Sequence, residues 1–297
     1  MTGLGFVGLG VMGGPMCRNL ARRSGEPVRV FDLNQPAVDA VADAGARPEP
    51  SLARLVEYSD IVFLSLPGGP QVDDVVTNGV LPHTRPGQIV VDLSTSPVAL
   101  VQRLATELAG AGAVFIDAPV ARTRQAAIDG TLSITVGAPD RDTFARVEPY
   151  LRHLATSVMH CGGAGSGALI KLLNNLVVFE TVVALAEACT LARRTGLVSD
   201  DVLFDALGAG SAASFVLENH GRKALLPDIH PQDIFPARYM RKDIGYALEL
   251  AESVGLTLPA GTLAGELLDA TCATGHADEY HTAVVRVIDQ PPTEAAR

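Results

Sequence analysis

The sequence predicts an α/β protein in which a doubly wound parallel sheet comes first and an all-helical domain follows. Up to about residue 160, short apolar runs alternate with helical stretches, which is typical of a parallel sheet with helices on both faces. Beyond Gly167 no convincing strand appears, and a length of 297 residues suggests about two domains. We place the boundary in the glycine cluster at 162–167. The expected domains are residues 1–163 and residues 164–297, the second opening with a long interdomain helix.

The first apolar run, Gly3–Val7, leads into a glycine-rich turn at the start of a predicted helix, Met12–Arg22. Gly8, Gly10 and Gly13 spell G-x-G-x-x-G, the pattern of a Rossmann-type dinucleotide-binding turn. The first glycine permits the tight bend, the second lets the backbone approach a pyrophosphate, and the third lets the helix pack on its strand. The helix N-terminus presents unpaired N–H groups to the phosphates. The residues assigned here to cofactor binding are Gly8, Leu9, Gly10, Val11, Met12 and Gly13.

The next apolar run, Val28–Phe31, ends in Asp32. An acidic residue about 20 residues past the glycine motif accepts a hydrogen bond from the ribose 2′-hydroxyl and repels a 2′-phosphate. Leu33 and Asn34 follow, with no arginine to receive such a phosphate. We therefore predict NAD as the cofactor, in preference to NADP. The alternative is a structural glycine turn with Asp32 capping the next helix.

The remaining elements continue the alternation of strand and helix. Further strands are predicted at Ile61–Leu66, Gln88–Asp92, Val114–Asp117, Leu132–Val136 and Ser157–Cys161. Helices are predicted first at Ala37–Ala44, Pro70–Val76, Val98–Ala109 and Arg141–Leu154, and then at Ala168–Arg194, Ser199–Ala206, Arg238–Val254 and Leu258–Ala273. Ligands of an open parallel sheet bind at the carboxyl ends of its strands. The residues expected there, facing the cofactor side, are Leu66, Pro67, Gly68, Asp92, Leu93, Ser94, Thr95 and Asp117–Val120.

Composition limits the possible partners. A net charge of -10 with 47% hydrophobic and 19% charged residues is an ordinary globular profile, without the basic footprint that nucleic acid or an anionic membrane requires. The four cysteines are scattered and predict neither a disulfide framework nor a zinc site, and no histidine spacing suggests a metal. With no room for a signal peptide before the first strand, we expect a cytoplasmic protein. The longest apolar run, Leu169–Ala192, contains five polar or charged residues and is predicted to be a buried helix, not a membrane span.

Lys171, Asn174 and Asn175 lie near the start of that apolar helix, at spacings that place them on one face. A buried lysine is costly unless it is paired or neutral. Burial lowers the pKa of a lysine, as a general acid/base near neutrality needs. The alternative is a lysine that extends from the helix start to solvent.

Five separated motifs, in order and spread over nearly the whole chain, carry a family resemblance. They are Gly5–Met16, Asp92–Thr95, Asp117–Val120 with Gly130–Leu132, Gly165–Asn175, and Phe235 with Lys242–Asp243. In these the chain resembles the β-hydroxyacid dehydrogenase family, which includes 3-hydroxyisobutyrate dehydrogenase and tartronate semialdehyde reductase. The resemblance implies a Rossmann domain, an all-helical second domain, an active site between them, and a homodimer or homotetramer built through the helical domain.

The resemblance also implies roles for individual residues. Lys171 would be the catalytic acid/base, and Asn175 would hold the substrate and the lysine. Ser94 and Thr95 would lie near the nicotinamide and the substrate, with Thr95 serving both. Asn174 and Phe235 would also bind the substrate, and Lys242 the cofactor. The alternatives for Phe235 and for Lys242 with Asp243 are a core aromatic and a solvated charge pair.

One loop departs from the family pattern. Where the family commonly has Ser-Gly-Gly, this chain has Ala121-Arg122-Thr123. A guanidinium offers planar, bidentate recognition of an anion. The Arg-Thr form resembles a smaller branch that includes sulfolactaldehyde reductase, in which the arginine meets a sulfonate. Arg122 and Thr123 are therefore expected to bind a substrate with a strong or bulky anionic group. The alternative for Arg122 is a surface residue paired with an acid.

The predicted activity is reversible, metal-free hydride transfer between NAD and the hydroxyl or carbonyl carbon of a small anionic 3-hydroxy acid or sulfonate analogue. Lys171 would move the proton. Two alternatives remain: an imine reductase on the same scaffold, and a non-catalytic NAD-binding regulator. The NADP preference typical of imine reductases and their lack of a lysine at this position argue against the first. The presence of Lys171, Asn175 and the Ser94-Thr95 pair argues against the second.

Overall fold

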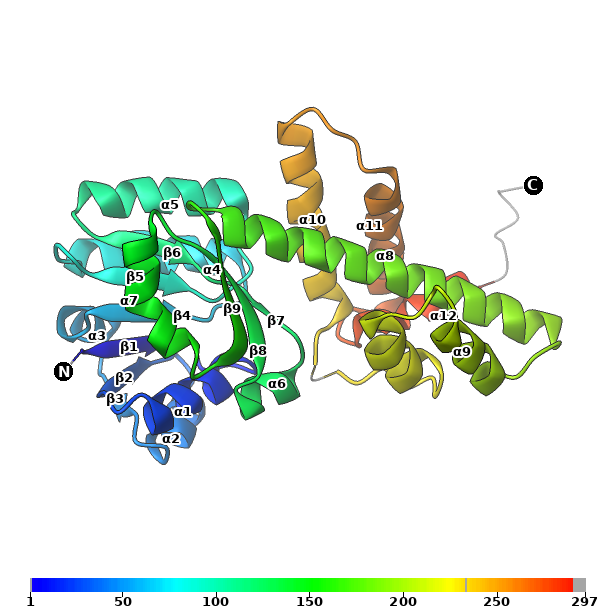
Figure 1. Ribbon diagram of the computed structural model, residues 1–297, viewed down its shortest axis with the longest axis horizontal. Coiled ribbons are helices and arrows are strands. Elements are labelled where there is room, and N and C mark those ends of the chain that lie inside the picture. The colour runs from blue at the N-terminus through cyan, green and yellow to red at the C-terminus, as the bar shows by residue number, and fades with distance from the viewer. Residues whose placement is uncertain (1, 233, 291–297) are drawn as a thin grey trace. The chain divides into compact units, whose positions relative to one another are not determined.

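A computed structural model describes residues 2–232 and 234–290 of the chain (Figure 1). The chain forms two compact units, Met1–Lys171 and Leu172–Arg297, and the division falls inside helix α8 (Ser166–Thr195). Each unit has its own core and is described by itself.

The first unit is built on a nine-stranded sheet with the order β3-β2-β1-β4-β5-β6-β8-β7 and with β9 beside β8. Neighbouring strands from β3 to β6 are parallel, β8 is antiparallel to β6 and β7, and β9 is parallel to β8. The strands are β1 (Leu4–Val7), β2 (Val28–Phe31), β3 (Arg47–Pro48), β4 (Ile61–Leu64), β5 (Ile89–Asp92), β6 (Val114–Asp117), β7 (Val120–Ala121), β8 (Leu132–Gly137) and β9 (Ala155–Gly162).

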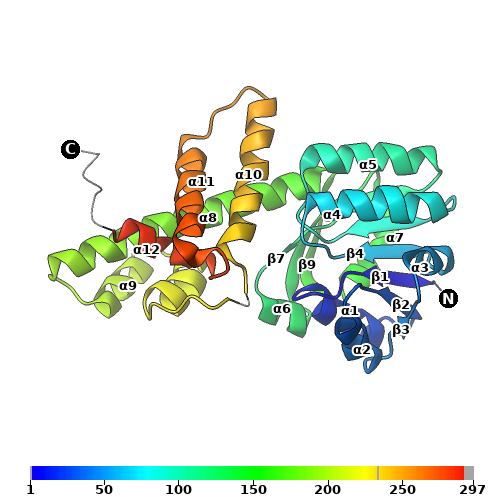
Figure 2. The same cartoon turned by 180° about the vertical axis from the view of Figure 1, so that it is seen from behind.

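Helices cover both faces of this sheet, and each face has its own apolar core. The alternating side chains Phe6 and Phe63 belong to one cluster, with Met16 of α1 and Leu151 of α7, whereas Val62 belongs to the other cluster. Figures 1 and 2 show α1 and α2 on one side of the sheet, and α4 and α5 on the other. The helices are α1 (Gly13–Arg23), α2 (Gln35–Ala42), α3 (Leu52–Tyr58), α4 (Gly69–Asp74) continued by η1 (Val75–Val80) and η2 (Leu81–His83), α5 (Val98–Gly110), α6 (Arg124–Asp129) and α7 (Arg141–Leu151).

The predicted α/β class is confirmed, with additions that the sequence patterns missed. The short elements β3, β7, α3 and α6 are new. The reversal at β8 is also new, since the sheet is parallel only as far as β6. Only the short helix α6 and two loops lie between β7 and β8, and antiparallel strands tolerate a short connection where parallel strands need a longer crossover.

The second unit is helical, and no strand is assigned to its described residues up to 290. Its core gathers Phe179 of α8, Phe204 of α9, Leu217 of η3 and Met240 of α10. Besides α8, the helices are α9 (Asp200–Ala209), η3 (Leu217–Leu225), α10 (Ala237–Ser253), α11 (Pro259–Thr271), η4 (Cys272–His276), η5 (His281–Val284) and α12 (Val285–Ile288). The four predicted helices of this half are present, whereas η3 and the elements after α11 were not predicted.

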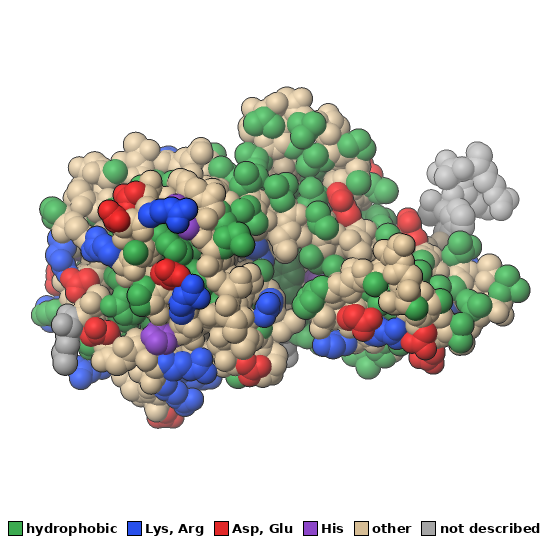
Figure 3. Space-filling model, in the orientation of Figure 1, with side chains coloured by type: hydrophobic (Ala, Val, Ile, Leu, Met, Phe, Trp, Pro, Cys, Tyr) green, Lys and Arg blue, Asp and Glu red, His purple; other side chains and the backbone are tan. Residues whose placement is uncertain are grey.

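Helix α8 is buried on only part of its surface, so the prediction of a buried helix is only partly correct. By length and composition α8 could cross a membrane, with a mean hydropathy of 1.8 over its most apolar stretch, and 44% of that stretch is buried. Its large exposed apolar side chains lie mostly between residues 169 and 177, with one more near the end of the helix, and Figure 3 shows hydrophobic side chains along its course. They are Leu169, Ile170, Leu173, Val177 and Leu191. The long apolar run predicted this helix, but which of its sides is covered by other helices depends on the packing of elements far away in the sequence.

Candidate active site

The carboxyl edge of the parallel strands brings together the residues of the first unit that were predicted to bind the cofactor. In the register of the sheet, Val7 lies beside both Phe31 and Leu64, and Leu64 lies beside Asp92. The loops that follow these residues therefore adjoin one another along one edge. They carry Gly8–Gly13 after β1, Asp32 after β2, Leu66 and Pro67 after β4, and Ser94 and Thr95 after β5.

The three motif glycines are required for different reasons. Gly8 has a φ of +90°, and a Cβ there would lie 2.2 Å from the carbonyl oxygen of Ser65. A Cβ on Gly13 would lie 2.0 Å from the carbonyl oxygen of Gly8, so this glycine is needed for α1 to pack on β1. A Cβ on Gly10 would meet no atom of the protein within 4 Å. The protein's own packing does not require this glycine, and the space fits close approach of a pyrophosphate.

The start of α1 is also suited to phosphate. No side chain caps the helix at Met12, and its first turn contains no acidic residue. The positive end of the helix dipole therefore faces no carboxylate of that turn. Val11 and Leu9 belong to the same loop, and the backbone N–H of Leu9 donates to the Asp32 carboxylate at 2.5 Å.

Asp32 connects the glycine turn to the end of β2. Besides the bond from Leu9, its second oxygen accepts from the backbone N–H of Asn34 at 2.7 Å. Helix α2 has Asn34 at its N-cap position, so Asp32 is not the capping residue of that helix. Leu33 is 94% exposed. The carboxylate is thus held in place by two backbone groups at the edge where a ribose would lie.

The loop after β5 is organised by Asp92, whose hydrogen bonds were not predicted from the sequence. Its oxygens accept from the backbone N–H of Ser94 at 2.9 Å and from the Ser96 hydroxyl at 2.6 Å. The Ser94 hydroxyl accepts from the backbone N–H of Leu66 at 2.8 Å, which joins the loops after β4 and β5. Thr95 is half-buried beside them. A buried aspartate at a strand end followed by serines could have indicated this arrangement.

The loop that departs from the family pattern is held in an unusual conformation. Arg122 has a φ of +89°, in the region that favours glycine, and its side chain is exposed. One guanidinium nitrogen, Nη1, donates to the carbonyl oxygen of Thr131 at 2.8 Å. Thr123 caps helix α6, since its hydroxyl accepts from the backbone N–H of Ala126 at 3.3 Å. The hydroxyl of Thr123 therefore has a structural role that the sequence analysis did not foresee.

Asp117 does not direct its side chain toward the cofactor, so that expectation is wrong for this residue. Its carboxylate is 1% exposed and accepts from the backbone N–H groups of Gly165 and Ala168, at the start of α8. Burial raises the pKa of Asp117 to about 6, and the neighbouring Asp92 raises it as well, against the lowering effect of the hydrogen bonds. A carboxylate at a strand end is ambiguous in sequence, because the helix that it caps lies 48 residues away.

Asn174 and Asn175 take part in a polar network between α8 and α10. The buried Asn175 side chain donates from Nδ2 to Asp243 Oδ2 at 2.6 Å, and its Oδ1 accepts from Asn174 at 3.1 Å. Asp243 is 1% exposed, and its other oxygen lies 2.8 Å from the ammonium nitrogen of Lys242. Lys171 is half-buried on α8, one helical turn before Asn175. Asp243 was predicted only as part of the Lys242–Asp243 motif, and its hydrogen bond with Asn175 was not predicted from the sequence.

Phe235 and Lys242 have aromatic surroundings within the second unit. The half-buried Phe235 ring lies 6.3 Å from that of Tyr239 and 5.9 Å edge-on from His281. The Lys242 ammonium lies 5.1 Å from the ring centroid of Tyr246. Phe235 is thus neither a fully buried core residue nor a free one. Within residues 2–232 and 234–290, no group of three or more His, Cys, Asp or Glu side chains could hold a metal ion.

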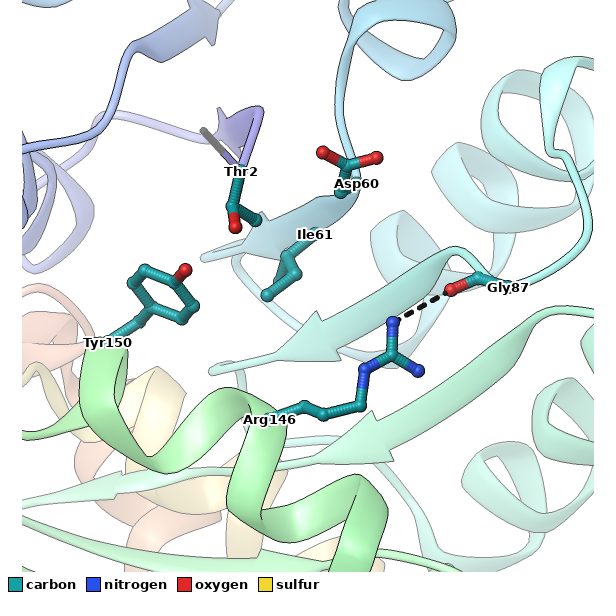
Figure 4. A pocket seen from close by; sticks show the side chains of 6 residues that line it. All are labelled: Thr2, Asp60, Ile61, Gly87, Arg146 and Tyr150. Carbon is teal, nitrogen blue, oxygen red and sulfur yellow. Dashed lines mark hydrogen bonds between the residues drawn. The ribbon is translucent and has the colours of Figure 1, made fainter.

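A separate cavity of about 270 Å³ lies at the opposite, amino edge of the sheet (Figure 4). It contains the residues that precede or begin β1, β4 and β5, and Arg146 of α7 donates to the carbonyl oxygen of Gly87 at 3.1 Å across it. Its lining residues are Thr2, Asp60, Ile61, Gly87, Arg146 and Tyr150. None of them was predicted as a site residue, and the predicted cofactor-binding residues of the first unit lie at the other end of the strands.

Comparisons with known proteins agree with these geometric features. Residues 3–163 match the family model of the NAD binding domain of 6-phosphogluconate dehydrogenase, and residues 165–288 match that of the NAD-binding region of NADP-dependent 3-hydroxyisobutyrate dehydrogenase. The chain is 34% identical to 2-hydroxy-3-oxopropionate reductase of Escherichia coli (strain K12), over 96% of this chain and 97% of the relative. It is 32% identical to 3-hydroxyisobutyrate dehydrogenase of Pseudomonas aeruginosa, over 90% and 91%.

One solved structure is similar to this chain over nearly its whole length. The 3-hydroxyisobutyrate dehydrogenase of Mycobacterium tuberculosis, determined with L-serine, is 32% identical and superposes with a TM-score of 0.88, over 98% of this chain and 100% of the other. The likeness therefore extends through both units and does not depend on the nucleotide-binding half alone.

Proposed function

Because the chain belongs to the β-hydroxyacid dehydrogenase family, we propose that it transfers hydride reversibly between NAD and the carbinol or carbonyl carbon of a small anionic 3-hydroxy acid or sulfonate analogue. The observation that carries the proposal is the pair Lys171 and Asn175, which lie one turn apart on α8. The side chain of Asn175 is fixed by its hydrogen bond to the buried carboxylate of Asp243. A non-catalytic binding protein would need neither.

In this mechanism the protein binds, orients and moves a proton. Lys171 accepts the hydroxyl proton during oxidation and donates one to the developing alkoxide during reduction. The Asn175 amide, fixed by Asp243, orients the reacting oxygen and the lysine. When bound, the nicotinamide supplies the hydride acceptor or donor.

The test is an initial-rate assay of NADH formation with 3-hydroxyisobutyrate, glycerate, 3-hydroxypropionate, 4-hydroxybutyrate and dihydroxypropanesulfonate. We expect Lys171→Ala to lower kcat at least about 100-fold while NADH still binds, since general acid–base catalysis contributes about that much. Lys223→Ala is the control, because Lys223 pairs with Asn219 on the surface of η3. Unchanged turnover in Lys171→Ala, or no turnover of any acid by the wild type, contradicts the proposal.

The preference for NAD rests on Asp32 and on the residues beside it. A carboxylate held by two backbone N–H groups repels a 2′-phosphate, and Leu33 offers no positive charge. Replacing both, as Asp32→Ala with Leu33→Arg, should raise kcat/KM with NADP and lower it with NAD, measured for the two cofactors in parallel. A wild-type enzyme that already uses NADP as well as NAD contradicts this proposal.

Arg122 is proposed to select the anionic group of the substrate. Its guanidinium is oriented by Thr131, and a non-glycine residue at a φ of +89° is strained by about 1–2 kcal/mol. Arg122→Gly should therefore raise the free energy of unfolding by about 1 kcal/mol and raise KM for the best substrate about tenfold. Arg124→Ala, two residues on and exposed, is the control for general loss of charge. An unchanged KM in Arg122→Gly assigns Arg122 to the surface only.

We also propose that a second copy of the chain covers the exposed apolar side of α8. Leu169, Ile170, Leu173 and Val177 gather on the first half of the helix and Leu191 lies near its end. Exposed apolar groups of this kind are typical of a helix that packs on a partner. The alternative cover, lipid, would have to accommodate Lys171, Glu180 and Glu187 within the same helix.

A further inference from the structure

We propose that Asp117 is a positioning residue for Lys171, whose carboxylate clamps the first turn of α8 and so fixes the lysine one turn further along. This inference rests on the proposed role of Lys171 as acid/base. All the groups concerned belong to the first compact unit, Met1–Lys171.

The clamp consists of two hydrogen bonds from backbone N–H groups three residues apart at the helix start. Asp117 Oδ1 accepts from Gly165 at 2.9 Å, and Oδ2 accepts from Ala168 at 2.7 Å. Ala168 precedes Lys171 by three residues, about 4.5 Å of helix rise. Ser166, of a residue type that usually caps helices, has a buried hydroxyl without a hydrogen-bond partner in the described structure. The cap of α8 is thus supplied from the end of β6, a rigid element, and not from the helix itself.

The backbone on both sides approaches the carboxylate closely. A Cβ on Gly137 would lie 2.2 Å from Asp117 Oδ1, and a Cβ on Gly167 would lie 3.0 Å from Oδ2 and 2.4 Å from the carbonyl oxygen of Thr135. The Thr135 hydroxyl in turn donates to the carbonyl oxygen of Gly167 at 3.2 Å. Strands β6 and β8 therefore hold the first turn of α8 from two directions, and little freedom is left for it to shift.

This site holds a charge under unfavourable conditions. Burial raises the pKa of Asp117, and Asp92 on the adjacent strand β5 raises it further. Cys161 of β9 lies within electrostatic range, and burial and Asp117 both raise its thiol pKa. The two N–H groups and the positive end of the helix dipole offset this cost. A neutral residue would be easier to bury, so the specific contribution of the carboxylate is its pair of acceptor oxygens.

The test is Asp117→Asn, which keeps the shape of the side chain but replaces one acceptor oxygen with an N–H donor. We expect kcat for the best hydroxy acid to fall about 10- to 100-fold, because a displacement of about 1 Å at the reacting group costs about that much. KM for NAD and the Kd for NADH should stay within about twofold, since the glycine turn and Asp32 are untouched. Hydrogen exchange of amides 165–171 should become faster.

A deuterium isotope effect on kcat separates misplacement from a smaller active fraction. With carbinol-deuterated 3-hydroxyisobutyrate, a misplaced lysine slows the chemical step and raises the isotope effect, whereas fewer intact molecules leave it unchanged. Asp140→Asn is the matched control. Asp140 also caps a helix, accepting from the backbone N–H of Thr143 at 2.6 Å, but α7 carries none of the proposed catalytic residues.

Several results overturn the proposal: an unchanged kcat, an unchanged exchange rate at 165–171, or an equal loss of kcat in Asp140→Asn. If Asp117→Asn does not fold, Thr135→Val can be used, because it removes only the hydrogen bond from the Thr135 hydroxyl to Gly167 in the first turn of α8. In this variant kcat should fall while KM for NAD stays unchanged. If the wild type oxidises none of the acids, the proposed function fails separately, and the exchange measurement still decides whether Asp117 holds α8.

Discussion

At the scale of single residues, Gly10 and Gly13 contrast most sharply. Both belong to the same motif, yet of the two only Gly13 lies where an added Cβ would overlap the protein's own backbone, at the carbonyl oxygen of Gly8. A Cβ on Gly10 would have no atom of the protein within 4 Å. A glycine needed for packing and a glycine needed for a ligand should therefore respond differently to the same substitution.

We predict that Gly10→Ala leaves the free energy of unfolding within about 1 kcal/mol of the wild type but weakens NADH binding at least about tenfold, because the new methyl group occupies ligand space. Gly13→Ala should destabilise the fold by about 2 kcal/mol or more, since its Cβ would overlap the Gly8 carbonyl. Urea unfolding and NADH fluorescence titration measure the two effects. Equal loss of stability in both variants would show that the open space at Gly10 is not a ligand site.

At the scale of elements, a cluster of histidines joins three helical segments of the second unit. His281 of η5 is fully buried and packs against Phe179 of α8, and it lies 5.2 Å from the ring of His220 of η3. The Tyr280 hydroxyl lies 2.6 Å from His220 Nδ1. Burial lowers the pKa of His220 to about 4 and lowers that of His281 well below its usual value. The packing of these segments therefore requires neutral imidazoles.

This requirement makes the stability of the second unit dependent on pH. A histidine pKa that is lower in the folded than in the unfolded state contributes stability above about pH 6.5, which is lost as pH falls toward the folded value. We expect the free energy of unfolding to decrease by a few kcal/mol between pH 7 and pH 4.5, measured by urea titration. His220→Gln should reduce this dependence, and His83→Gln, an exposed site in the first unit, should not. A pH dependence that is identical in both variants rules out a contribution from His220.

At the scale of the whole molecule, the exposed apolar residues of α8 bear on the proposed association of two copies of the chain. Val177 and Leu191 are 60% and 66% exposed, in a helix whose other side forms the core of the second unit. Exposed apolar side chains grouped on one helix are typical of a subunit interface.

If a second copy covers this side, sedimentation of the wild type should give at least a dimer. Val177→Glu combined with Leu191→Glu should shift it to the monomer, because two carboxylates in an apolar interface lose hydration without gaining partners. Val202→Glu is the control, since Val202 is also exposed, at 56%, but lies on α9 and not on α8. A monomeric wild type excludes the proposed partner.

From the amino-acid pattern alone one could predict the fold class, the carboxyl edge with Gly8–Gly13, Asp32 and Ser94, and the common face of Lys171 and Asn175. These features could be predicted because each depends on short-range geometry: period-two or helical spacing, a glycine turn, or the common direction of parallel strands. The family resemblance added the expected chemistry, which local geometry does not contain.

The three-dimensional packing selects the hydrogen-bond partner of each polar side chain. It pairs Asn175 with Asp243, 68 residues away, turns Asp117 toward α8, and uses Thr123 as a helix cap. It also leaves one side of α8 uncovered. Polar side chains such as these could form hydrogen bonds with several different groups. The selected partner depends on which distant elements pack together, since a buried polar group is stable only where packing supplies its hydrogen bond.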